Sequence, residues 1–167
     1  KNPDTFLGPL VSKGHWDKVK TSVDQAVQEG GKLLHGGDAP ESLPKDLKKG
    51  YFLNPTVIAD LTDCSELQQR EVLGPLVTLR SFKYPHEAVK WANTSPYGLS
   101  ASLWTTDVSR AHKMAAQIKA GRVWVNTWFK NDLRMPIGGS KQSGSGRMGG
   151  DDALQFFSEQ KTICLGL

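Results

Sequence analysis

Three glycines near the C-terminus have the spacing of a phosphate-binding loop. Gly144, Gly146 and Gly149 formally match the GxGxxG pattern, in which backbone N–H groups approach and hold a phosphate. That pattern functions where a strand leads directly into a helix and an acidic residue follows about 20 residues later. Residues 136–143 have the composition of a poor strand, and too few residues follow for a second strand that bears an acid. A stand-alone dinucleotide-binding module is therefore a weak interpretation.

Two cysteines are the candidates for a thiol nucleophile. Cys64 and Cys164 are far apart and have no CxxC or His/Cys spacing, so the sequence predicts neither a metal site nor a disulfide scaffold. Cys164 has apolar neighbours and is expected to lie buried in a strand, where a thiol is inert. We therefore expect no catalytic residue and no bound metal in this chain. Such sparse cysteine usage is typical of the reducing cytoplasm.

A long loop follows a short apolar segment. Residues 122–126 alternate as a half-buried strand does, and residues 127–147 are rich in glycine and contain a proline. Loops longer than about 12–15 residues are uncommon in compact domains and tend to carry function. We expect this loop to form a binding surface.

Five motifs, in the same order along the chain, resemble the C-terminal part of the NAD(P)-dependent aldehyde dehydrogenase superfamily. They are GYFLNPTV at 50–57, EVLGP at 71–75, NTSPYGL at 93–99, WVN at 124–126 and PIGGSKQSGSGR at 136–147. The segments 126–129 and 132–134 are most similar to the branch that oxidises 2-aminomuconic and 2-hydroxymuconic semialdehydes. The resemblance covers nearly the whole chain.

The resemblance implies a cofactor, NAD, and two residues that contact it. A carboxylate at the end of a short helix, such as Glu71, is more often solvated than functional. In the family, however, the glutamate of this motif holds the hydroxyls of the nicotinamide ribose, since a carboxylate accepts from two donors. Leu73 stands where the family has an aromatic residue beside the nicotinamide.

The resemblance also implies a small-molecule aldehyde as substrate. The residues expected to line its entrance lie in the long loop: Trp128, Phe129, Asn131, Arg134 and Ile137. The two aromatic rings would provide apolar walls for a flat, conjugated chain.

Arg134 has three interpretations. The muconic branch usually carries an arginine that binds the substrate carboxylate at the position of Asn131. Arg134 can be a displaced substitute for it, because a guanidinium grips a carboxylate through two hydrogen bonds of fixed geometry. It can also be a structural partner of Asp132, or a solvated loop charge.

Composition narrows the class of protein. A chain of 167 residues can bury one core, and its net charge of +4 is dispersed among almost as many acids. No basic stripe indicates nucleic acid, and no apolar run approaches the 18 or more residues of a membrane span. We expect neither nucleic acid nor membrane as a partner.

Periodicity predicts an α/β fold. Ser12 caps a helix that Gly30 ends, and Asp107 caps another that Gly121 ends. Asp63 or Ser65 is expected to cap a brief helix at 66–70. Further helices are expected at 85–92 and from Asp151 or Asp152, and strands at 51–59, 76–82, 99–105, 122–126 and 161–165. The alternation indicates right-handed βαβ crossovers and a mostly parallel sheet.

We interpret the chain as the C-terminal half of an aldehyde dehydrogenase catalytic domain, residues 1–155, plus an oligomerisation strand segment, residues 156–167. The nucleophilic cysteine, the general base, the oxyanion donor and the Rossmann module of the family are expected upstream, in a missing N-terminal part of the same polypeptide. The isolated chain should be inactive. An exposed terminal strand invites pairing with another chain, and the resemblance implies that it joins the subunits of a homo-oligomer, a dimer or a tetramer. The alternative is a non-catalytic interaction or structural module with the same fold.

Overall fold

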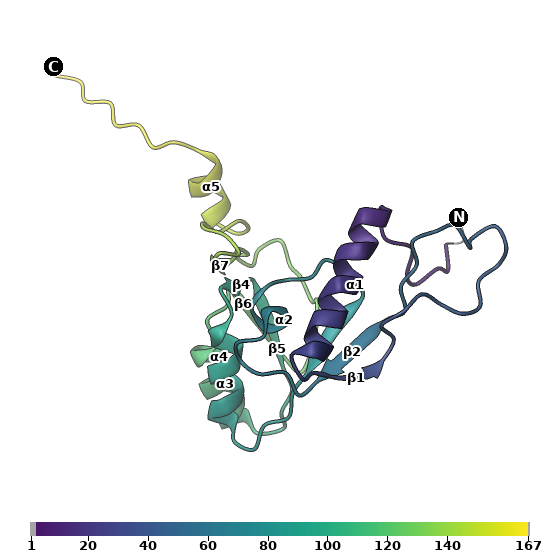
Figure 1. The fold of residues 1–167 in the computed structure, drawn as a ribbon. Helices are drawn as coiled ribbons and strands as arrows, with labels where there is room; N and C mark the ends of the chain where they lie inside the picture. The colour runs from purple at the N-terminus through teal and green to yellow at the C-terminus, as the bar shows by residue number, and fades with distance from the viewer. Residues whose placement is uncertain (1–2, 167) are drawn as a thin grey trace. The chain divides into compact units, whose positions relative to one another are not determined.

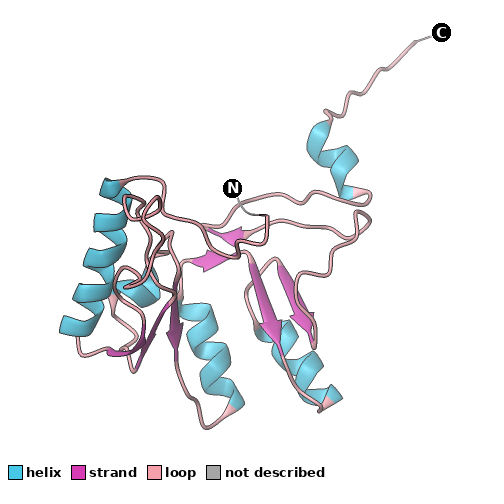
Figure 2. Ribbon diagram, turned by 90° about the vertical axis from the view of Figure 1, so that its right-hand side faces the viewer, coloured by secondary structure: helices cyan, strands magenta, loops and turns pink. Residues whose placement is uncertain are grey.

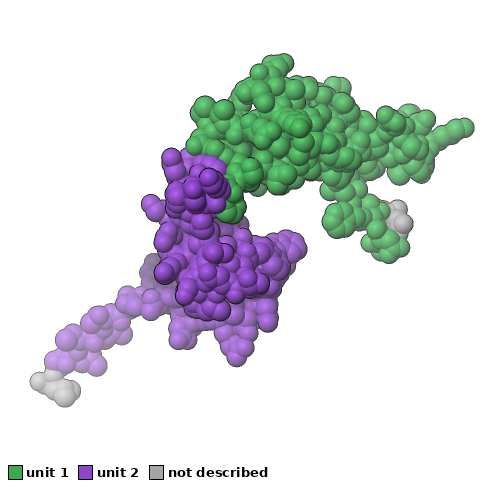
Figure 3. Space-filling model, turned by 90° about the horizontal axis from the view of Figure 1, so that it is seen from below, with its two compact units in different colours: residues 1–82 green, residues 83–167 purple. Residues whose placement is uncertain are grey.

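The structure is a computed structural model that describes residues 3–166. It divides into two compact units, Lys1–Phe82 and Lys83–Leu167, which Figure 3 distinguishes by colour. Helices and strands alternate along both units, as Figures 1 and 2 show, so the chain is a mixed α/β protein as predicted. The predicted boundary between residues 155 and 156 stays a prediction.

Unit 1 contains a three-stranded sheet of order β1-β2-β3. Its elements are α1 (Lys13–Gln28), β1 (Lys32–His35), β2 (Thr56–Ala59), α2 (Glu66–Gln69) and β3 (Leu76–Leu79). Strands β2 and β3 are parallel, and β1 is antiparallel to β2. Pro55 directly precedes β2, where its missing N–H costs no ladder bond, so the central strand of the sheet begins after it.

Helix α1 packs its apolar face on this sheet. Val23 and Ala26 form a buried cluster with Ile58 of β2 and with Leu61. At the N-terminus of the helix, the Ser12 hydroxyl accepts a hydrogen bond from the His15 N–H at 3.2 Å. At the other end Gly30 takes a φ of +97°, which a glycine adopts without steric cost. Both predicted ends of the helix are confirmed.

The cap predicted for α2 is wrong. Ser65 occupies the N-cap position, but its side chain makes no capping hydrogen bond. Its hydroxyl donates instead to Glu29 at 2.5 Å, and Asp63 forms an ion pair with Arg80. Ser65 and Asp63 therefore bind residues distant in the sequence and do not cap the helix.

Unit 2 contains two small sheets and three helices. Its elements are α3 (Pro85–Thr94), β4 (Tyr97–Gly98), β5 (Ser100–Leu103), α4 (Val108–Gln117), β6 (Arg122–Val125), β7 (Ser140–Lys141) and α5 (Asp152–Phe157). Strands β5 and β6 are parallel and are joined through α4, whereas β4 and β7 are antiparallel. The predicted cap of α4 is confirmed, because the Asp107 carboxylate accepts from the Arg110 N–H at 2.9 Å. Asp151 occupies the N-cap position of α5 without a side-chain hydrogen bond.

Gly121 does not end α4 as predicted. The helix stops at Gln117, and Ile118 is already extended with ψ of 119°. A Cβ on Gly121 would lie 1.7 Å from the carbonyl oxygen of Gly138. Glycine is therefore needed here for a close approach of two backbones, and the turn at the helix end does not require it.

The C-terminal strand is not present within the single chain. Residues 159–166 have no helix or strand assignment, and Ile163, Cys164 and Leu165 are exposed. The prediction of a buried Cys164 is therefore wrong for this chain. A strand needs a neighbouring ladder, and the described part of this chain places none beside residues 159–166. Pairing with a second chain stays a prediction.

Across residues 3–166 we find no helix with the length and apolarity needed to cross a membrane.

Candidate functional site

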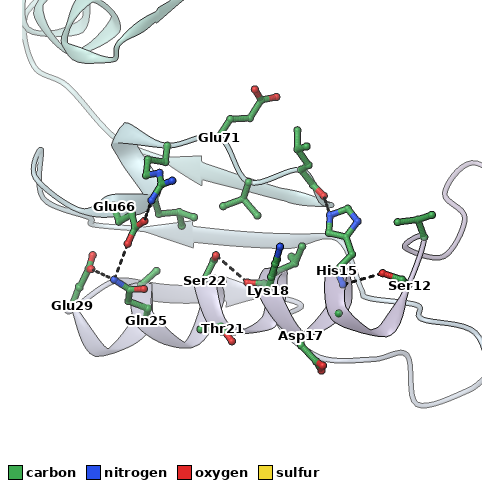
Figure 4. A pocket seen from close by; sticks show the side chains of 18 residues that line it. Ser12, His15, Asp17, Lys18, Thr21, Ser22, Gln25, Glu29, Glu66 and Glu71 are labelled. Atoms are coloured by element: carbon green, nitrogen blue, oxygen red, sulfur yellow. Dashed lines mark hydrogen bonds and ion pairs between the residues drawn. The ribbon is translucent and has the colours of Figure 1, made fainter. Parts of the chain in front are cut away.

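Glu71 and Leu73 lie together in the loop between α2 and β3 of unit 1. Both side chains are exposed. Figure 4 shows the Glu71 carboxylate directed away from α1, and among the described residues no hydrogen bond or ion pair to that carboxylate is found. A carboxylate in this position can accept from two hydroxyls of a ligand.

Helix α1 holds this loop in place. The Nε2 atom of His15 donates to the carbonyl oxygen of Leu73 at 2.6 Å. Beside it, Gly74 packs so closely on Val19 that an added Cβ would lie 2.9 Å from the valine methyl groups. The helix thus positions the backbone that directly follows the Leu73 side chain. Sequence reasoning missed His15, and no local signal identifies it, because its partner lies 58 residues away.

A groove of about 980 Å³ runs between α1 and this loop (Figure 4). Two other carboxylates that line the groove, those of Glu29 and Glu66, already have partners. The Gln25 amide donates to Glu29 at 3.1 Å and to Glu66 at 3.2 Å, and Arg70 pairs with Glu66 at 2.8 Å. Glu71 is thus the acid at the rim of this groove that is best placed to accept from a ligand.

The long loop of unit 2 begins with two residues at positive φ. Asn126 has a φ of +53°, and its amide is fixed by two hydrogen bonds to the backbone of Thr105, at 2.8 and 2.9 Å. Phe129 has a φ of +56°, which is strained for a residue with a large side chain. The rings of Trp128 and Phe129 are exposed, with centroids 5.3 Å apart. The strained turn therefore presents both rings to solvent.

Asn131 contacts an arginine that the sequence analysis did not select. The Arg122 guanidinium donates to the Oδ1 atom of Asn131 and lies over the Trp124 ring, 5.4 Å from its centroid. The Trp124 indole N–H donates to the carbonyl oxygen of Lys130 at 2.9 Å. The loop therefore folds back along β6. Strand alternation, which places residues 122 and 124 on one face, was the available signal for Arg122.

Arg134 pairs with Asp132. Its Nε and Nη2 atoms donate to the two carboxylate oxygens at 2.9 and 2.6 Å, and its backbone N–H donates to Oδ1 at 2.9 Å. The side-chain bonds to Arg134, followed by the backbone bond, lower the pKa of Asp132 to about 2. The same pairing raises the pKa of Arg134. Of the three interpretations, the structure shows the partnership with Asp132. A role of Arg134 in binding substrate stays a prediction.

Ile137 lies where the loop closes. Its backbone pairs with Met148 through hydrogen bonds of 2.6 and 2.8 Å, and its side chain is partly exposed. The Arg147 guanidinium donates to the carbonyl oxygens of Gly139 and Gly146 at 2.8 Å. These bonds make the end of the loop a compact, internally bonded segment.

Two of the three GxGxxG glycines, Gly146 and Gly149, are explained by this closure. Gly146 and Gly149 take φ values of +76° and +90°. A Cβ on Gly146 would lie 2.5 Å from the Phe156 ring, and one on Gly149 would lie 2.4 Å from the carbonyl oxygen of Met135. The backbone conformation and the close contacts explain why glycine stands at these two positions, so no phosphate-binding role is needed to explain it.

The predicted residues thus form two clusters. Glu71 and Leu73 form the first, in unit 1, and the substrate residues form the second, in unit 2. Within the second, Asn131 is joined to Arg122 and Arg134 to Asp132.

Comparison with known proteins gives a consistent assignment. The family model described as "Aldehyde dehydrogenase family" matches residues 1–163. The chain is 45% identical over 166 residues to a 2-hydroxymuconic semialdehyde dehydrogenase of Pseudomonas sp. (strain CF600), covering 99% of this chain and 34% of the relative. It is 41% identical over 164 residues to the 2-aminomuconic semialdehyde dehydrogenase of Danio rerio, covering 97% and 34%.

Solved structures agree. PnpE from Pseudomonas sp. WBC-3 superposes with a TM-score of 0.86 at 40% identity, covering 95% of this chain and 32% of that one. Betaine aldehyde dehydrogenase from Staphylococcus aureus in complex with NAD+ gives a TM-score of 0.85 at 37% identity, covering 93% and 31%. This chain therefore spans about a third of the length of the proteins it matches.

Proposed function

We propose oxidation of an aldehyde to a carboxylic acid with NAD for the protein that contains this chain, because the chain belongs to the aldehyde dehydrogenase family. The observation that carries the proposal is the 45% identity to a semialdehyde dehydrogenase over 99% of the chain. The two compact units match one continuous third of such enzymes. The remaining parts of the reaction, above all the nucleophilic thiol and the base, would come from other parts of the polypeptide.

The cofactor would contact unit 1. NAD, when bound, accepts the hydride of the aldehyde carbon. The exposed carboxylate of Glu71 fits two ribose hydroxyls, since it can accept from both. Leu73, 68% exposed, would offer apolar surface to the nicotinamide. The hydrogen bond from His15 to the Leu73 carbonyl ties this loop to α1, which would help Glu71 and Leu73 to orient the cofactor.

The aldehyde would contact unit 2, and its class would be a semialdehyde that carries a carboxylate. Relatives between 40% and 45% identical are named 2-hydroxymuconic or 2-aminomuconic semialdehyde dehydrogenases, and at 39% identity a betaine aldehyde dehydrogenase stands beside two further 2-aminomuconic semialdehyde dehydrogenases. Trp128 and Phe129 present flat exposed rings that suit a conjugated chain. Asn131 and Ile137 are further residues proposed to face the substrate, whereas Arg134, whose guanidinium pairs with Asp132, is proposed to shape the loop that carries them.

The test is a steady-state assay of the full-length protein. NAD reduction should be measured with 2-hydroxymuconic semialdehyde, with a neutral aldehyde of similar length, and with no aldehyde. We expect turnover with both aldehydes and a higher kcat/KM with the acidic one. No NAD reduction with either aldehyde would overturn the proposal and favour a non-catalytic module with the same fold.

A further inference from the structure

Arg122 is a cation whose charge no carboxylate neutralises among the described residues. Its guanidinium donates to a neutral group, the amide oxygen of Asn131, and lies over the Trp124 ring. Other arginines differ: Arg70, Arg80, Arg110 and Arg134 are each in an ion pair with a carboxylate. Arg147 donates to carbonyl oxygens that close the loop. Arg122 therefore keeps most of its capacity to bind an anion.

The surroundings of Arg122 strengthen that capacity. The side chain is half-buried, and the aromatic face beneath it removes part of its hydration. A charge that has lost part of its water interacts more strongly with an incoming anion. Lys130, by comparison, is exposed, and its ammonium is a hydrated point charge without a fixed fork of donors.

Asn131 adds a second donor at the same place. Its Oδ1 atom accepts from Arg122, which leaves the Nδ2 group with two N–H donors. The side chain is exposed, so an approaching group can reach it. A carboxylate set against this pair would accept from the guanidinium with one oxygen and from the amide with the other.

We propose that Arg122 and Asn131 together bind the carboxylate of the substrate and set the preference for an acidic aldehyde. The proposal rests on the proposed function and deepens it. It also assigns different tasks to the two arginines of this region. Asp132 already occupies the guanidinium of Arg134 through two side-chain bonds, so Arg134 organises the loop while Arg122 provides the charge that the substrate meets.

The test compares variants of the full-length enzyme by one quantity, the ratio of kcat/KM for the acidic semialdehyde to kcat/KM for a neutral aldehyde of similar length. Arg122→Ala should lower this ratio at least about tenfold. Arg122→Lys should restore only part of it, because an ammonium lacks the planar fork. Arg110→Ala is the matched control, an arginine of the same unit that pairs with Asp107, and it should leave the ratio unchanged.

Asn131→Asp separates substrate binding from loop structure. The new carboxylate would pair with Arg122 as Asp132 pairs with Arg134, so the contact between loop and strand would become stronger while the positive charge would be neutralised. We expect the ratio to fall at least about tenfold with the melting temperature unchanged or raised. A ratio that stays at the wild-type value in both Arg122→Ala and Asn131→Asp would overturn the proposal and leave Arg122 a structural residue.

Arg134→Ala completes the comparison. In this variant the ratio of kcat/KM for the acidic aldehyde to that for the neutral aldehyde should change less than about threefold. A fall as large as that of Arg122→Ala would mean that Arg134 binds the substrate carboxylate, and it would contradict the proposal. Failure of the proposed function looks different, because the wild-type enzyme would then reduce no NAD with either aldehyde.

Discussion

Asp132 and Arg134 form a bidentate ion pair across two residues of one exposed loop, with donor–acceptor distances of 2.9 and 2.6 Å. The Arg134 side chain is 88% exposed, so the pair lies in contact with water. The side-chain hydrogen bonds are the main cause of the lowered pKa of Asp132. A further bond, from the Arg134 backbone N–H to the Asp132 carboxylate, ties residues 132–134 into a turn of the loop.

The first prediction concerns pH. The pKa of Asp132 is lowered from 3.8 to about 2, chiefly by the side-chain bonds to Arg134. Because the folded-state pKa is depressed, the contribution of this pair is fully present above about pH 4 and is lost as the pH falls toward 2. Carboxyl NMR of the aspartate-labelled protein, with Asp132→Asn for assignment, should show this group still ionised at pH 3.5. A titration midpoint near 3.8 would mean that the ion pair is absent in solution.

The second prediction concerns Glu71. In the full-length protein, Glu71→Gln should weaken NAD binding about tenfold, on the order of 1.4 kcal/mol, because an amide replaces the charged acceptor for the ribose hydroxyls. The fold should be unaffected, since the side chain is exposed. Calorimetric titration with NAD measures the dissociation constant. Glu41→Gln, an exposed acid in the surface loop before β2, is the control, and equal constants for the two variants would remove Glu71 from the site.

The third prediction concerns Gly121. Gly121→Ala should destabilise the protein by about 3 kcal/mol or more, because the new Cβ meets the Gly138 carbonyl oxygen 1.7 Å away and neither backbone can yield cheaply. Gly14→Ala, in helix α1 with nothing within 4 Å of the added carbon, should be neutral or stabilising by up to about 1 kcal/mol. Thermal denaturation of both variants measures the difference. Similar melting temperatures would show that the close approach does not exist in solution.

The fourth prediction is that the 167-residue chain alone reduces no NAD with an aldehyde. Positioning a nucleophile and a cofactor supplies much of a barrier reduction of roughly 8–23 kcal/mol, and this chain covers only 34% of a relative that performs the reaction. The purified chain should be assayed beside a Cys64→Ala, Cys164→Ala variant. Turnover by the wild-type chain above that control would show that a cysteine of this chain is the nucleophile.

The fifth prediction concerns assembly. Residues 161–166 are exposed and have no strand partner in the described chain, and their backbone groups can form a ladder with another chain. Deletion of residues 161–167 should lower the oligomeric state of the full-length protein, as measured by light scattering. Cys164→Ser, which retains the backbone donors and acceptors, should leave the mass unchanged. An unchanged mass after the deletion would place the interface elsewhere.

Local signals in the sequence determined the helices and most strands. Ser12 and Asp107 cap helices where predicted, because an N-cap bond joins residues only three positions apart. The strand predicted at 51–59 forms only from Thr56 onward, directly after Pro55, which lacks a backbone donor. The aldehyde dehydrogenase family was recognisable from five motifs, and the comparisons confirm it.

Tertiary structure alone decided how the candidate site is held. Ser65 lost its capping role to a bond with Glu29, and Gly121 proved to serve a backbone contact with Gly138. His15 reaches Leu73 across 58 residues, and Arg122 reaches Asn131 after the loop has turned back along β6. A sequence encodes such contacts only through the packing of whole elements, because the partners share no spacing or local bond that a motif could show. The terminal strand differs again: its ladder needs neighbouring backbone that the described part of one chain does not place beside it.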